Sequence, residues 1–89
     1  MPRIRIDPQQ VRTVAQTFKQ KSQESQQMIA QLETQINNMQ AEWEGMAAQK
    51  FYGDFEQWRA SMKQFTQLLE GIGQQLEQIA NTMAAADGQ

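Results

Sequence analysis

Apolar side chains recur at steps of three and four residues along two long stretches, one on each side of the middle of the chain. The first series runs over residues 11–43 and the second over residues 51–86. This spacing places one apolar stripe along a helix, as in the heptad repeat of coiled coils. No stretch alternates apolar and polar residues with the period of a strand. The pattern therefore predicts an all-α chain.

The first helix has a recognisable start. Asp7 is a suitable N-cap, Pro8 suits the first helical turn, and Gln10 stands where a capping box places its second member. After Pro8, neither glycine nor proline occurs again until Gly45. We therefore expect a single helix over residues 8–41.

The second helix is expected to follow a short turn. Glycine ends helices and forms tight turns readily, so Trp43-Glu44-Gly45 predicts a turn at 43–45 and a second helix over 46–84. Three glycines inside that helix each weaken it by about 1 kcal/mol relative to alanine. The 89 residues form one domain, 1–89, which is an antiparallel two-helix hairpin.

The two apolar stripes match when the helices pack antiparallel, in the register that sets Ile36 opposite Phe51. Ser22 and Ser25 are the polar members of the first stripe. This register places Ser22 against Phe65, so that a small side chain meets a large one. The predicted seam consists of Phe18, Ile29, Leu32 and Ile36 in the first helix and Phe51, Phe55, Trp58, Phe65, Leu69 and Ile72 in the second.

One edge of the hairpin is apolar and the other is charged. Arg12, Lys19, Glu33 and Arg59 fall on the charged edge. A two-helix hairpin has little interior, so we expect a second copy to cover the apolar edge in an antiparallel four-helix bundle, a homodimer. The alternative is that a few scattered apolar residues are ordinary surface. The proposed dimer edge consists of Val14, Met28 and Leu68.

Composition restricts the possible functions. The chain contains neither cysteine nor histidine, which removes the commonest metal ligands and the commonest general base. We therefore expect no catalytic residue, no metal and no cofactor, and the seam serines have no histidine to activate them. The net charge of −2 comes from mixed charges, which does not favour nucleic-acid binding.

Membrane functions are also disfavoured. No run of 18 apolar residues is present, and the polar faces are rich in glutamine rather than in lysine and arginine, so membrane binding is not expected. The N-terminal residues lack the apolar core of a cleaved signal peptide. If the protein is exported, we expect a route without such a signal.

The central Trp43-Glu44-Gly45, the length and the flanking amphipathic helices resemble the WXG100 (ESAT-6-like) family over the whole chain. The lead-in Asn38-Met39-Gln40-Ala41-Glu42 and the spacing of Ala47, Phe51 and Phe55 are also similar to that family. The resemblance implies a helical hairpin that dimerises into a four-helix bundle. It also implies a type VII (ESX) secretion substrate that folds in the bacterial cytoplasm and is secreted without a cleaved signal.

The resemblance implies further partners and a recognition site. Trp43 and Gly45 would form part of a surface read by the secretion ATPase, together with the C-terminal end of the other subunit. Other WXG100 or LXG-type proteins would be further candidate partners. The chain departs from actinobacterial members because residues 81–89 contain no Tyr-x-x-x-Asp/Glu motif. The match at Tyr52–Glu56 starts the second helix and is interpreted as chance.

This departure favours the homodimeric members from Firmicutes over the actinobacterial heterodimers. The alternative function is an intracellular coiled-coil adaptor or structural module. It would share the hairpin and its seam, and it would not be exported. The role of Trp43 in export distinguishes the two interpretations.

Overall fold

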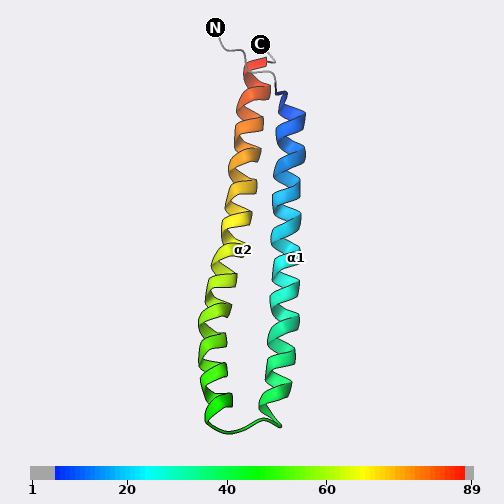
Figure 1. Ribbon diagram of the computed structural model, residues 1–89. Helices are drawn as coiled ribbons and strands as arrows, with labels where there is room; N and C mark the ends of the chain where they lie inside the picture. Colours follow the sequence, from blue (N-terminus) through cyan, green and yellow to red (C-terminus); the bar gives the residue numbers. More distant parts are fainter. Residues whose placement is uncertain (1–5, 88–89) are drawn as a thin grey trace.

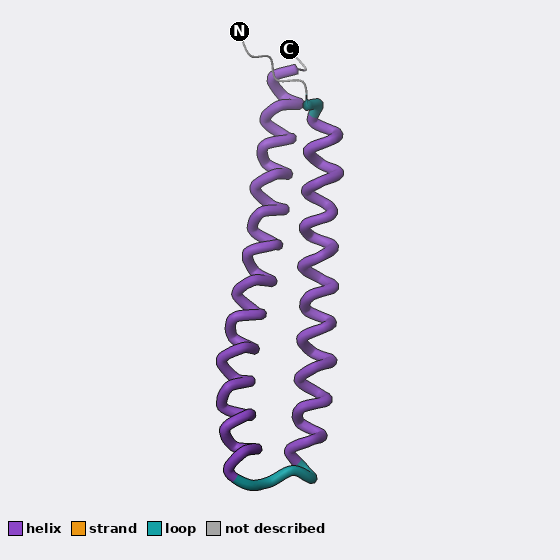
Figure 2. The backbone as a smooth tube through the Cα atoms, in the orientation of Figure 1, coloured by secondary structure: helices purple, strands orange, loops and turns teal. Residues whose placement is uncertain are grey.

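The computed structural model describes residues 6–87, which form two long antiparallel helices joined by one short turn (Figure 1). Helix α1 spans Pro8–Gln40 and α2 spans Met46–Asp87. The hairpin is a rod with extents of 66 × 23 × 15 Å. The start of α1 and the end of α2 lie together at one end, and the loop in Figure 2 closes the other. The expected all-α hairpin is thus the observed fold. Residues 1–5, which make up most of the N-terminal segment expected to lack a cleaved signal peptide, lie outside the described residues.

A reciprocal capping box starts α1, as predicted. The Asp7 carboxylate accepts the Gln10 backbone N–H at 2.8 Å, and the Gln10 side-chain oxygen accepts the Asp7 backbone N–H at 3.0 Å. Pro8 occupies the first turn, where it gives up no intrahelical hydrogen bond. Two of the unpaired N–H groups at this helix end are therefore satisfied.

A glycine with a positive φ separates the two helices. The backbone N–H groups of Glu42 and Trp43 both donate to the Met39 carbonyl, which closes the end of α1. Gly45 then adopts φ +115°, a conformation that side chains disfavour. Its carbonyl accepts the Gln49 N–H at 3.0 Å and so begins the hydrogen bonding of α2.

The inner face of α1 follows the predicted stripe. Its buried positions repeat at steps of four and seven residues, and half-buried positions between and after them continue the same stripe. The buried residues are Val11, Ala15, Ser22 and Ile29, and the half-buried ones are Phe18, Ser25, Leu32 and Ile36.

The inner face of α2 differs from the prediction. Trp58 and Phe65 are 53% and 56% exposed, so neither belongs to the seam. Ser22 packs against Thr66 instead of Phe65, and its hydroxyl donates to the Thr66 carbonyl at 3.0 Å. The buried residues of α2 are Ala48, Phe55, Thr66, Gly73 and Ala80.

This difference has a physical cause, which is the close approach of the helices. A Cβ built on Gly73 would lie 2.8 Å from Lys19 Cγ and 3.0 Å from the Ala15 carbonyl oxygen. Small residues let the two backbones approach, and the next column of large residues is then displaced to the outside. The predicted register is therefore wrong by one residue at these layers.

Polar contacts fasten the charged edge. Lys19 pairs with Glu77 at 2.9 Å, and Arg59 pairs with Glu33 at 2.8 Å. The hydrogen bond from Arg59, helped by the charge of nearby Lys63, holds the pKa of the Glu33 carboxyl below its ordinary value. The charged edge predicted from the sequence is thus a row of contacts between α1 and α2. Neither helix, over the described residues, is apolar enough along its length to cross a membrane.

Candidate functional site

An aromatic cluster occupies the turn end of the hairpin. The Trp43 ring packs against both Phe51 and Tyr52, with ring centroids 5.8 and 5.7 Å away. Phe51 extends the cluster to Phe55 at 6.3 Å and to Trp58 at 6.0 Å. Trp43 nevertheless remains 39% exposed, so part of the indole is available to a partner. Offset and edge-on aromatic pairs of this kind are favourable beyond their buried area.

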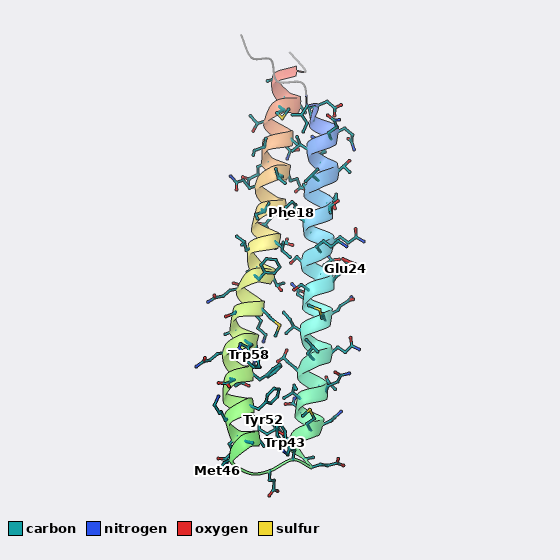
Figure 3. All side chains as sticks on the ribbon, viewed as in Figure 1. Phe18, Glu24, Trp43, Met46, Tyr52 and Trp58 are labelled. Carbon is teal, nitrogen blue, oxygen red and sulfur yellow. The ribbon has the colours of Figure 1, made fainter. Side chains whose placement is uncertain are left out.

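Tyr52 contacts Trp43 twice. Its ring meets the indole edge-on, at an interplanar angle of 72°, and its hydroxyl donates to the Trp43 carbonyl at 3.3 Å. Figure 3 shows the two side chains together beside the turn. The sequence does not predict this contact, because the Tyr52–Glu56 motif match carries no information about the path of the turn. The proximity of two aromatic residues to the turn was the available signal.

The surface around the turn is apolar at its tip and acidic beside it. Met46 is 89% exposed and lies at the turn end of the rod (Figure 3). Glu42 and Glu44 flank Trp43 and are also exposed. Gly45 immediately precedes Met46, the first residue of α2. The predicted turn residues Trp43 and Gly45 therefore sit on an accessible surface.

Large apolar side chains line one long side of the hairpin, which we call the apolar face. The predicted edge residues Val14, Met28 and Leu68 are 44%, 52% and 57% exposed. Two further members, Trp58 and Phe65, were predicted for the inner seam of α2, and Ile79 joins them at 43% exposed. The apolar face consists of Val14, Met28, Trp58, Phe65, Leu68 and Ile79.

A groove of about 480 Å³ opens between the helices on this face, near the middle of the rod. Met28, Met62, Phe65 and Leu69 supply most of its apolar lining. Isolated exposed apolar residues are ordinary, but several large ones beside a groove are typical of an interaction site.

The hydroxyl groups in the interior bind one another rather than a catalytic partner. Ser22 donates to the Thr66 backbone, and Ser25 and Thr66 share a hydrogen bond of 2.5 Å between their hydroxyl oxygens. No buried side-chain nitrogen or oxygen lacks a hydrogen-bond partner over residues 6–87. In the same residues, no group of three or more His, Cys, Asp or Glu is placed to hold a metal ion. The arrangement is that of a packing layer.

Comparison with known proteins identifies the family. Residues 3–88 match the family model WXG100, described as proteins of 100 residues with WXG. Protein YukE of Bacillus subtilis is 32% identical over 84 residues, covering 94% of this chain and 87% of YukE. Type VII secretion system extracellular protein A of Staphylococcus aureus is 33% identical over 89 residues, covering all of this chain and 92% of that protein.

Solved structures agree in fold. The secreted protein EsxB of Bacillus anthracis superposes with a TM-score of 0.85 at 36% identity, covering 98% of this chain and 99% of that chain. EsxA of Geobacillus thermodenitrificans gives a TM-score of 0.86 at 29% identity, covering 97% and 94%. The match to the family model spans the Trp43-Glu44-Gly45 turn and both helices, and the chain belongs to the WXG100 family.

Proposed function

We propose that this protein is a small exported substrate of a type VII secretion system and acts by binding other proteins, without catalysis. Family membership supports the proposal, as does a relative of nearly equal length that is named as an extracellular protein of that system. The observation that carries it is the half-exposed Trp43 on an accessible Trp-x-Gly turn. The protein folds in the bacterial cytoplasm and leaves without a cleaved N-terminal signal.

The turn is the part of this chain that the secretion ATPase reads. Trp43 offers a large apolar ring that is held by two aromatic neighbours, and Gly45 permits the backbone to present it. Partly exposed tryptophans are frequent anchors of protein–protein interfaces because they bury a large area on binding. The C-terminal end of a partner subunit completes the surface.

A second copy of the chain covers the apolar face. In a two-fold dimer the same patch faces itself, so Phe65 and Leu68 of one hairpin meet the groove lined by Met28 and Met62 of the other. The groove lies near the middle of the rod, so a two-fold axis passing close to it buries the whole face in an antiparallel four-helix bundle. Further WXG100 or LXG-type proteins are additional candidate partners.

The export proposal is tested with Trp43→Ala in a host that has an active type VII system. We expect the variant to accumulate in cells and to remain a helical dimer, because Trp43 lies outside the apolar face. Met46→Ala is the matched control: it shortens an exposed apolar side chain outside the Trp-x-Gly pattern and should be exported. Secreted and cellular fractions are compared by immunoblotting.

Normal export of Trp43→Ala would contradict the role of the turn. Retention of the unaltered protein in cells with a working secretion system would favour the alternative, an intracellular coiled-coil adaptor. Circular dichroism and light scattering on the purified variant exclude misfolding as the cause of retention.

A further inference from the structure

We propose that Tyr52 is a positioning residue, which holds Trp43 in the orientation in which a partner reads it. The inference rests on the proposed export role of Trp43. It assigns a function to a residue outside the Trp-x-Gly pattern, nine positions along the chain.

The geometry places Tyr52 against both the side chain and the main chain of Trp43. The two ring centroids are 5.7 Å apart in an edge-on arrangement, and the phenol hydroxyl donates to the Trp43 carbonyl at 3.3 Å. A ring contact alone would leave the Trp43 peptide free to rotate and to carry the indole with it. The hydrogen bond to the Trp43 carbonyl also restrains that peptide. Two contacts from one side chain therefore restrain the ring and its base together.

The Trp43 carbonyl lies outside the hydrogen bonding of both helices. It follows the end of α1 and precedes α2, so it belongs to neither ladder of helical hydrogen bonds. Over residues 6–87, no backbone N–H donates to this oxygen, while the Trp43 N–H is fixed by the Met39 carbonyl at 2.8 Å. Tyr52 thus supplies the second attachment of this peptide.

Tyr52 is itself anchored. Its side chain is half-buried and helps to line a small cavity of about 50 Å³ between the helices, with Ile36, Gln40 and Phe55. The Tyr52 ring also meets Phe51 edge-on, with centroids 5.8 Å apart. A side chain held by both helices can transmit their rigidity to the exposed indole. A pre-oriented anchor loses less conformational freedom on binding and so binds more tightly.

The test removes the hydroxyl alone, by Tyr52→Phe. Trp58→Phe is introduced in every sample for fluorescence, so that Trp43 is the one tryptophan observed. We expect lower steady-state anisotropy of Trp43 and stronger quenching by acrylamide in Tyr52→Phe. Export, measured in the otherwise unaltered chain, should fall by at most about fivefold, the factor for the net free energy of one hydrogen bond, because this bond is long and exposed.

Thr34→Val is the matched control. It removes an exposed hydroxyl that donates to the Ala30 carbonyl at 3.0 Å within α1 and makes no contact with Trp43. Its Trp43 anisotropy and its export should equal those of the parent protein. A Tyr52→Phe variant that lowers only the melting temperature, with Trp43 anisotropy and export unchanged, would overturn the proposal.

The outcomes separate this inference from the export proposal. If Trp43→Ala stops export and Tyr52→Phe alters neither fluorescence nor export, the positioning role fails and the role of the turn stands. If Trp43→Ala is exported normally, the role of the turn fails. The fluorescence of Tyr52→Phe then still decides whether Tyr52 holds the indole.

Discussion

Gly45 gives the turn between the two helices a backbone conformation that other residues disfavour. Its φ of +115° is strained for any residue with a Cβ, although the space around it is open. We expect Gly45→Ala to lower the free energy of unfolding by about 1–3 kcal/mol through backbone strain alone. Urea denaturation, monitored by circular dichroism, measures this free energy of unfolding. Gly53→Ala, at an open helical position, is the control and should not destabilise; equal stability of both variants would contradict the prediction.

Gly73 and Gly71 differ in their surroundings although the sequence treats them alike. A Cβ at Gly73 would lie 3.0 Å from the Ala15 carbonyl oxygen, whereas a Cβ at Gly71 meets nothing within 4 Å. Gly71→Ala should therefore raise stability by about 0.5–1 kcal/mol, the ordinary gain from alanine in a helix. Gly73→Ala should lower it because the helices must separate. Denaturation midpoints compare the two, and a gain at both positions would show that the close approach is not required.

At the scale of the element, α1 was predictable because one apolar stripe runs along its whole length, whereas Lys21 interrupts the flanking positions Val14 and Met28. Asp7 and Pro8 define its start by local chemistry, and its small or apolar inner residues form one continuous column. Helix α2 has two adjacent columns that both satisfy the heptad. One contains Trp58 and Phe65, and the other contains Thr66 and Gly73. Hydrophobicity alone would place the first column against α1. The close approach of the two backbones at Gly73 instead places the second column there.

The contacts of α1 with α2 also make stability depend on pH. Arg59 donates to Glu33 and lowers the pKa of that carboxyl below 4.5. The ionised carboxylate is thus favoured by folding, so its contribution is complete above pH 4.5 and is lost as the pH falls through the lowered value. We expect Glu33→Gln to lose less stability than the unaltered protein between neutral pH and pH 3 or so.

Denaturation at a series of pH values tests this expectation. Glu24→Gln is the control, since Glu24 pairs with Lys21 inside α1 and joins no second helix. Its dependence on pH should follow that of the unaltered protein. Parallel curves for Glu33→Gln and the unaltered protein would show that the contact with Arg59 does not link stability to pH.

At the scale of the whole molecule, the turn and the charged edge could be predicted, but the extent of the apolar face could not. Trp43 and Gly45 carry a local signal, and edge charges such as Lys19 and Arg59 follow from helical periodicity. Periodicity cannot say whether an apolar column faces its own hairpin or a second one. The Tyr52 contact depends on the path of the turn, which three residues of sequence do not determine.

The outward position of the large residues gives the last prediction. The buried core contains mostly small side chains, while Phe65 and Leu68 are more than half exposed, so an isolated hairpin gains little from apolar burial. A dimer that buries the apolar face should therefore melt at a temperature that rises with protein concentration.

Leu68→Glu places a charge on the apolar face and should lower both the melting temperature and the mass in solution. Gln67→Glu adds the same charge at a neighbouring position that lines a different hollow, with Glu33 and Lys63, and should leave the dimer intact. Light scattering after size exclusion measures the mass. A mass of 10.3 kDa for the unaltered protein at all concentrations would rule out the homodimer, and equal masses for both variants would show that Leu68 lies outside the interface.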